Sequence, residues 1–285
     1  MKIHMVNPYR SLLFVPGARL EVYAKAVETG ADIICIDLED AVADNIKDKV
    51  RNSTFALLAE IEKPDRIERW IRINSLRTTT GLADLLALAD ANTAPDGIMV
   101  PKISSPDEVR ILRDLVSSKH PNLRFHPLIE TNDGLQTVHE IAKASHKVGS
   151  LVFGGFDMSA ELRVAPSWES LLYARQNLVH AAASADIDLL DMPNFNLDNL
   201  SELEEETVAS ANLGFTGKCA IHPKQVDTIN GVFSPLAEDV ERARDLVAKY
   251  EAQDKGFAVI DGVLMEKPVL RRLYRTIAIA KRIES

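Results

Sequence analysis

The stretch DIICIDL, residues 32–38, is almost continuously apolar and is followed at once by Glu39 and Asp40. An apolar run of this length, rich in isoleucine, predicts a strand that is covered on both faces, as in a parallel sheet. Concentrated negative charge at the end of such a strand needs a reason. Asp37 and Glu39 share one face by their period-two spacing, whereas Asp40 turns into the following loop.

Seven other stretches share this character, and segments with apolar residues at helical spacing separate them. The eight predicted strands are 11–16, 32–38, 69–74, 97–102, 124–130, 150–157, 187–193 and 217–223. The intervals suit one strand, one helix and two loops each, so the pattern predicts an α/β fold, a (β/α)8 TIM barrel. The alternative is an open doubly wound sheet, which usually has fewer strands, and no GxGxxG motif follows the first strand here.

The chain continues beyond the eighth predicted strand. Residues 236–255 predict an amphipathic helix, a hairpin or turn is expected around Asp261-Gly262, and residues 269–285 predict a final helix. We therefore divide the chain into a catalytic barrel, 1–235, and a C-terminal helical extension, 236–285, which we expect to act as a lid and an oligomer contact.

Composition excludes several classes of protein. The chain has 285 residues, of which 46% are hydrophobic, enough for a large core. Its two cysteines, Cys35 and Cys219, lie in apolar runs, which is typical of core residues in a reducing compartment. No signal segment or membrane-spanning run is found, so we expect a soluble, cytoplasmic protein with no membrane partner. A net charge of −9 argues against broad nucleic-acid binding.

Polar side chains stand at the ends of all eight predicted strands. In a barrel of this type, the C-terminal ends of the strands form the active site, so polar ends on every strand predict a shared pocket. These residues are Arg19, Asp37, Glu39, Asp40, Arg72, Asn74, Lys102, Glu130, Asp157, Asp191 and His222. By contrast, we expect His126, within the fifth strand, to be a core residue. For His222 the sequence leaves two alternatives, the core and the rim of the pocket.

Glu130 and Asp157 end neighbouring strands and are candidate metal ligands. Two carboxylates with waters completing the shell suit Mg²⁺. The alternative is that both residues cap the helices that follow them. The sequence around them holds no His/Cys cluster at zinc spacing.

Two arginines are candidates for binding anions. Arg72 on an inward face calls for a negative partner, and its planar fork suits a carboxylate. The alternative is a structural ion pair with Glu39 or Asp40. Arg19 follows Pro-Gly, a backbone shape that favours approach to a phosphate, and the alternative is a solvated loop arginine.

Several longer motifs stand in order along the chain. They are RSLLFVPGAR (10–19), DLEDAVADNIKDKVR (37–51), IRIN (71–74), MVPKISSPDEV (99–109), LIETNDGL (128–135), FGGFD (153–157) and GFTGKCAIHPKQVDTINGVFSP (214–235). Together they resemble the citrate lyase β-subunit-like branch of the HpcH/HpaI aldolase family, from about residue 10 to residue 270. The resemblance implies a magnesium-dependent carbon–carbon lyase that acts on β-hydroxyacyl thioesters such as citramalyl-CoA or malyl-CoA.

The resemblance also implies roles for single residues and a homo-oligomer, either a trimer or a hexamer. Matched to the family's motifs, Glu130 and Asp157 would be the Mg²⁺ ligands, with Glu39 and Asp40 beside the metal. Arg72 would bind and polarise the 2-oxo acid, and Arg19 would lie near the CoA phosphates. Glu266 would be an acid donated by a neighbouring subunit. No Schiff-base lysine is required, so Lys102 is expected to be a pocket or structural charge.

Three positions depart from the family pattern. Phe156 stands where many relatives have an acidic residue, and Asp133 replaces a commoner small residue. Glu266 stands where CoA-lyase relatives have aspartate, which lengthens the acid by one methylene. The first two departures bear on the identity of the substrate, and the third bears on the catalytic role of the tail.

Other functions suit the same sequence. Within this fold the alternatives are a citrate lyase β subunit that acts on an acyl-carrier-protein thioester, and a malyl-CoA thioesterase. A non-enzymatic alternative is a barrel that senses CoA metabolites. The set of Glu130, Asp157, Arg72 and Asp40 argues against a sensor, because a sensor need not keep a complete metal-binding and polarising set.

Overall fold

The computed structural model describes residues 9–253 and 258–284. The chain forms two compact units. One is Tyr9–Asn230, and the other comprises, among the described residues, 231–253 and 258–284.

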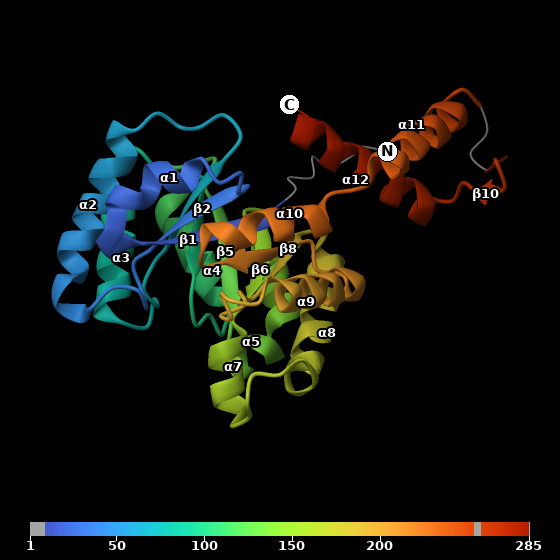
Figure 1. Ribbon diagram of the computed structural model, residues 1–285. Helices are drawn as coiled ribbons and strands as arrows, with labels where there is room; N and C mark the ends of the chain where they lie inside the picture. The colour runs from blue at the N-terminus through green and yellow to red at the C-terminus, as the bar shows by residue number, and fades with distance from the viewer. Residues whose placement is uncertain (1–8, 254–257, 285) are drawn as a thin grey trace. The chain divides into compact units, whose positions relative to one another are not determined.

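The first unit is a closed barrel of eight parallel strands that pair in chain order (Figure 1). The strands are β1 (Ser11–Pro16), β2 (Ile33–Asp37), β3 (Glu68–Arg72), β4 (Gly97–Val100), β5 (Arg124–Ile129), β6 (Ser150–Phe153), β7 (Asp188–Asp191) and β8 (Gly217–Ala220). Pairing of β1 with β8, with Leu12 opposite Cys219, closes the sheet. The predicted (β/α)8 barrel is confirmed, and the open sheet is wrong.

Helices connect the strands and lie outside the barrel (Figure 1). They are the 3-10 segments η1 (Gly17–Val22), η2 (Asp44–Ile46) and η3 (Pro223–Gln225), and the α-helices α1 (Tyr23–Val27), α2 (Lys47–Glu60), α3 (Thr79–Asp90), α4 (Pro106–Val116), α5 (Asn132–Gln136), α6 (Val138–Lys143), α7 (Gly155–Leu162), α8 (Trp168–Ala185), α9 (Leu200–Leu213) and α10 (Val226–Phe233). Side-chain caps fix several starts: Thr78 accepts from the Gly81 N–H before α3, and Ser105 from the Asp107 N–H before α4.

Large side chains fill the barrel. Trp70 and His126 are fully buried and stacked, with ring centroids 3.4 Å apart. His126 Nδ1 lies 2.8 Å from the Ser150 hydroxyl, and burial lowers the pKa of the imidazole well below its usual range. The predicted core role of His126 is therefore confirmed, and the neutral form of the imidazole avoids the cost of burying a charge.

A buried ion cluster lies on the outer face of β7 and β8. Asp191 Oδ2 lies 3.0 Å from Lys218 Nζ, and Asp191 Oδ1 lies 3.3 Å from Arg175 Nε on α8. The Ser210 hydroxyl of α9 donates to Asp191 Oδ2 at 2.6 Å. Burial alone would raise the pKa of Asp191, but Lys218 and Arg175 hold it below its usual value. The cluster thus ties two strands to two helices.

The second unit contains α11 (Ala237–Glu251), the short strands β9 (Val259–Ile260) and β10 (Val263–Leu264), and α12 (Lys267–Glu284). Its own core includes Leu246, Met265 and Leu270. The predicted turn is present: Asp261 and Gly262 have φ of 48° and 78° between two antiparallel strands, as a tight hairpin turn requires. The lid and oligomer roles expected for this extension stay predictions.

Across residues 9–253 and 258–284, no helix combines the length and the apolar character needed to cross a membrane. The cytoplasmic location stays a prediction.

Asp191→Asn should lower the free energy of unfolding of the barrel by about 3–5 kcal/mol, because it leaves two buried cations without their shared anion. Urea unfolding followed by tryptophan fluorescence measures this, since both tryptophans, Trp70 and Trp168, lie in the barrel unit. Asp198→Asn, at an exposed carboxylate, is the matched control and should change the stability little. A loss of less than about 1 kcal/mol in Asp191→Asn would contradict the assigned role of the cluster.

Candidate active site

A cavity of about 360 Å³ opens at the C-terminal ends of the barrel strands. Five charged side chains that the sequence placed at strand ends line it: Asp37, Asp40, Arg72, Glu130 and Asp157. They come from the ends of β2, β3 and β5 and from the first turn of α7. The predicted shared pocket therefore exists, although not every polar strand end contributes to it.

Arg72 is held in the pocket by three carboxylates. Its Nε and Nη2 donate to the two oxygens of Asp37, each at 2.7 Å, in a bidentate pair across β2 and β3. Its Nη1 lies 3.2 Å from Glu39 Oε2 and 3.2 Å from Asp40 Oδ2. The ion pair expected as an alternative is present with both acids, and the bidentate pair with Asp37 was not expected.

Asp37 also fixes the loop that carries the other two acids. Its Oδ1 accepts from the Glu39 N–H at 2.9 Å, and its Oδ2 accepts from the Ala41 N–H at 3.1 Å. One buried carboxylate thereby sets both the arginine and the loop. The sequence had indicated three acids at this strand end, but its period-two pattern gave no sign that they share one guanidinium.

Glu130 and Asp157 are not helix caps. Thr131 caps α5 by accepting from the Gly134 N–H, and the N-cap position of α7 is Gly154, which has no side chain to cap the helix. Glu130 is 3% exposed, whereas the Asp157 side chain is 47% exposed in the first turn of α7. The capping alternative is therefore wrong, and both carboxylates are left to the pocket.

The paired glycines of FGGFD allow this approach. A Cβ on Gly154 would lie 2.5 Å from Glu130 Oε2, and a Cβ on Gly155 would lie 2.2 Å from Met192 Sδ. Both distances are far below van der Waals contact. The two glycines thus bring the start of α7 against β5 on one side and the end of β7 on the other.

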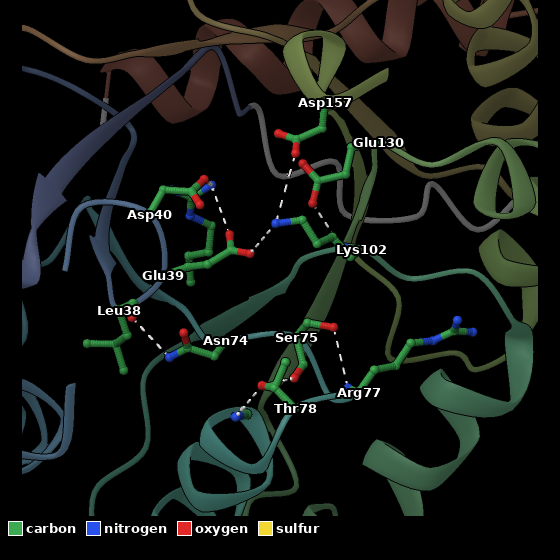
Figure 2. A network of polar contacts seen from close by, with 12 residues as sticks. Leu38, Glu39, Asp40, Asn74, Ser75, Arg77, Thr78, Lys102, Glu130 and Asp157 are labelled. Carbon is green, nitrogen blue, oxygen red and sulfur yellow. Dashed lines mark hydrogen bonds and ion pairs between the residues drawn. The ribbon is translucent and has the colours of Figure 1, made fainter. Parts of the chain in front are cut away.

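Lys102 joins the acids across the pocket, as Figure 2 shows. Its Nζ lies 3.1 Å from Glu39 Oε1 and 3.9 Å from Asp157 Oδ1, and its backbone N–H donates to Glu130 Oε1 at 2.8 Å. Burial alone would lower the pKa of Lys102, but Glu39, Glu130 and Asp157 raise it. A protonated ammonium in this position is a pocket charge and is unsuited to forming a Schiff base.

Negative charge in the pocket exceeds its positive charge. Burial, with Glu39 and Asp157 nearby, raises the pKa of Glu130 to about 8. Burial and Asp40 also raise the pKa of Glu39, although Arg72 and Lys102 oppose this. Among the described residues no lysine or arginine forms an ion pair with Glu130, and a divalent cation would supply the missing positive charge.

The donor set decides which cation could fit. In the part of the chain that the structure describes, no group of three or more His, Cys, Asp and Glu side chains is arranged to hold a metal ion. Two carboxylates are too few for a structural zinc site. They suit Mg²⁺, which takes one or two protein carboxylates and fills its shell with water and substrate oxygens.

Other predicted strand-end residues lie elsewhere. Asn74 follows β3 and donates to Asp84 of α3 at 2.7 Å and to the Leu38 carbonyl, so it supports the loop behind the pocket. Asp191 belongs to the buried cluster outside the barrel, and His222 accepts from the Lys224 N–H at the start of η3. Asn74 and Asp191 therefore do not line the predicted pocket. His222 is exposed, so the core alternative for it is wrong.

Two further predicted site residues, Arg19 and Glu266, belong to other elements of the chain. Arg19 is in η1, its side chain is 66% exposed, and its Nε lies 3.3 Å from Glu21 Oε1. Glu266 belongs to the second unit, where it is exposed between β10 and α12. Their roles toward the CoA phosphates and the reacting centre stay predictions.

The sequence that builds this pocket matches a known protein family. The model of the HpcH/HpaI aldolase/citrate lyase family matches residues 10–223. The chain belongs to this family. The match covers the barrel, including every charged residue of the pocket described above, so the predicted family is confirmed.

Curated relatives of this family cover nearly the whole chain. Human mitochondrial citramalyl-CoA lyase is 29% identical over 99% of this chain and 88% of its own length. The (3S)-malyl-CoA thioesterase of Cereibacter sphaeroides is 31% identical over 98% and 97%. The citrate lyase subunit beta of Leuconostoc mesenteroides is 30% identical over 95% and 93%. The chain is thus similar to enzymes of more than one reaction type.

A solved structure adds ligands to the comparison. The protein CitE from Mycobacterium tuberculosis, in complex with magnesium, acetoacetate and coenzyme A, matches with a TM-score of 0.74 and 28% identity, over 96% of this chain and 98% of that chain. That protein binds a divalent cation, a small oxo acid and a CoA on the same fold.

Glu130→Gln should stabilise the protein at high pH in the presence of a chelator. Because the folded state raises the pKa of Glu130 from 4.5 to about 8, it holds a proton that the unfolded chain releases, and stability falls as pH rises between these values. At pH 9 the variant should exceed the wild type by roughly 3–5 kcal/mol, and at pH 5 the two should nearly agree. Urea unfolding at both pH values measures this.

The control for this experiment is Glu140→Gln, at an exposed carboxyl of α6. It should give the same stability as the wild type at both pH values. A Glu130→Gln variant that is equally or less stable than the wild type at pH 9 would contradict the raised pKa.

Proposed function

We propose that this protein is a Mg²⁺-dependent carbon–carbon lyase. It cleaves or forms a β-hydroxyacyl-CoA thioester such as citramalyl-CoA or malyl-CoA, with acetyl-CoA and a 2-oxo acid, pyruvate or glyoxylate, as the other side of the reaction. The observation that carries the proposal is the joining of two metal-suited carboxylates, Glu130 and Asp157, with a fixed guanidinium, Arg72, in one pocket. Relatives named as lyases of such thioesters support it.

The reaction needs few groups from the protein. In the cleavage direction the hydroxyl loses its proton, the bond between C2 and C3 breaks, and its electron pair passes to the thioester as an enolate. The enolate carbon then takes up a proton. Glu130 and Asp157 would hold a Mg²⁺ ion, which supplies positive charge to the oxygen that becomes the ketone.

Arg72 would bind the oxo-acid half of the substrate. Asp37 accepts hydrogen bonds from Arg72 Nε and Nη2, so the orientation of the guanidinium is set before the substrate binds. The Nη1 edge, whose contacts with Glu39 and Asp40 are longer at 3.2 Å, is then the edge that meets the substrate. Glu39 and Asp40 would balance this charge and orient waters of the metal.

A second candidate is thioester hydrolysis, which the (3S)-malyl-CoA thioesterase relative favours. It would use the same pocket and release free CoA. A citrate lyase β subunit is the other alternative, because a relative of that name is 30% identical. It would act on a citryl acyl-carrier-protein thioester.

A cleavage assay on malyl-CoA and citramalyl-CoA should show turnover that depends on Mg²⁺ and is lost in a chelator. Chromatography separates the products: acetyl-CoA with an oxo acid identifies the lyase, and free CoA with the hydroxy acid identifies the thioesterase. Glu130→Gln and Asp157→Asn should each abolish turnover while the fold, checked by circular dichroism, is kept. Absence of cleavage of both thioesters with and without metal would reject the proposed activity.

We further propose a homo-oligomer, trimeric or hexameric, in which Glu266 of one subunit serves as acid or base at the pocket of a neighbour. Such an acid would move the proton to or from the carbon of the acetyl group. Exposed aliphatic side chains on adjacent barrel helices support self-association. They are Leu82 and Leu86 on α3 and Ile111 and Leu115 on α4, each at least 50% exposed.

Glu266→Ala should cut turnover sharply without changing metal binding. If the acid acts in a neighbouring subunit, mixing Glu266→Ala with Glu130→Gln protein should restore activity, to about a quarter of the wild type after subunit exchange, because intact barrels then meet intact tails. Full activity in Glu266→Ala alone would remove the residue from the mechanism. Loss without restoration would place its action within its own subunit.

A further inference from the structure

The pocket has two halves of different chemistry. The charged residues come from β2, β3 and β5 and from the start of α7, as described above. The remaining wall is apolar and includes Phe14, Phe153, Phe156, Met192, Phe195 and Ile221. Arg72 is the positively charged residue among the lining residues, all of which lie in the described part of the chain. The other cation of the site, Lys102, is paired with Glu39 and lies near Asp157.

Two aromatic rings dominate the apolar half. Phe156, in the first turn of α7, and Phe195, in the loop after β7, meet edge to face with ring centroids 4.2 Å apart. They are 40% and 54% exposed. Two half-exposed phenyl rings that line a pocket offer an apolar surface for a ligand to cover.

Backbone contacts fix the position of the pair. The close approach of Gly155 to Met192 holds the start of α7 against the end of β7. The loop that carries Phe195 is anchored at Asn194, whose carbonyl accepts from the buried Gln225 amide at 2.7 Å. The Asn194 amide donates to Glu206 at 3.0 Å. The apolar surface is therefore set before any ligand binds.

Charge limits what this surface can accept. Arg72 suffices for one carboxylate of an oxo acid, and three acids already surround it. Lys102 is already paired with Glu39 and lies near Asp157, so it is not a second free cation. A second carboxylate would face the phenyl rings or the negative half of the pocket, and burying an unpaired charge is costly. An alkyl group in the same place would cover the rings and gain from their burial.

We propose that Phe156 and Phe195 determine the specificity of the pocket. They select substrates whose hydroxyl-bearing carbon carries an alkyl group, against those that carry hydrogen or a carboxymethyl group there. The proposal rests on the lyase function proposed above. It assigns the pocket to alkyl-substituted 2-oxo monocarboxylic acids and disfavours dicarboxylic ones.

The test is condensation of acetyl-CoA with four oxo acids: glyoxylate, pyruvate, 2-oxobutyrate and oxaloacetate. The wild-type kcat/KM should be about tenfold higher for pyruvate or 2-oxobutyrate than for glyoxylate, because burial of one methyl or methylene group in a partly apolar pocket discriminates by about this factor. Oxaloacetate should be the poorest of the four. The thioester product is measured by chromatography.

Variants of Phe156 and Phe195 distinguish a role in substrate specificity from a general role in activity. Phe156→Ala and Phe195→Ala should lower kcat/KM for the two alkyl acids by about tenfold and leave glyoxylate within about twofold. Phe195→Leu should keep most of the preference. Phe195→Arg should raise the ratio of oxaloacetate to pyruvate by about tenfold, because it supplies the missing cation. Tyr173→Ala, at an exposed ring on α8 outside the pocket, should change none of the ratios.

Three results would overturn the proposal. The first is a wild type that prefers oxaloacetate or glyoxylate. The second is an equal loss for all four acids in the alanine variants, which would mean that the rings contact the CoA arm. The third is an unchanged oxaloacetate ratio in a folded Phe195→Arg. By contrast, a wild type that neither condenses nor cleaves any substrate rejects the lyase function itself, and this proposal falls with it.

Discussion

Pairing of β1 with β8 is the constraint on which the rest of this structure depends. An open parallel sheet leaves two edges with unpaired backbone groups, and closure removes both. Closure also brings the C-terminal ends of all eight strands to one rim. Asp37, Arg72, Glu130 and Asp157 are far apart in the chain, yet they line one cavity for this reason.

Within that rim, the balance of charge organises the polar half of the pocket. Asp37 accepts hydrogen bonds from one edge of the Arg72 guanidinium and from two backbone N–H groups of the following loop. The guanidinium and the acids beside it therefore form a rigid unit. Glu130, with a pKa raised to about 8, forms no ion pair with a lysine or arginine of the described residues. The site is thus prepared for a cation that the side chains do not supply. In the proposed function this half holds the metal and the oxo acid, and the proposed role of the aromatic half is the choice of substrate.

The sequence predicted the eight strands closely because each is a short apolar run bounded by turn residues. For several strands the predicted C-terminal end lies beyond the observed one. Residues 150–157 were expected as one strand, but β6 ends at Phe153 and α7 starts at Gly155. In the sequence, Gly154, Gly155 and Asp157 are equally compatible with the end of a strand and with the start of a helix. Only the contact of Gly154 with Glu130 and of Gly155 with Met192 decides between them.

By itself, the sequence determined the barrel, the turn at Asp261-Gly262 and the set of charged residues from which the pocket is built. Hydrophobic periodicity and turn chemistry are local, so a single chain carries them in full. The tertiary structure alone decided which polar strand ends share the pocket. Asp191 and Lys218 face the helices and pair there, whereas Asp37 turns to Arg72. The face that a side chain takes depends on strand register and barrel closure, and these are set by partners distant in the sequence.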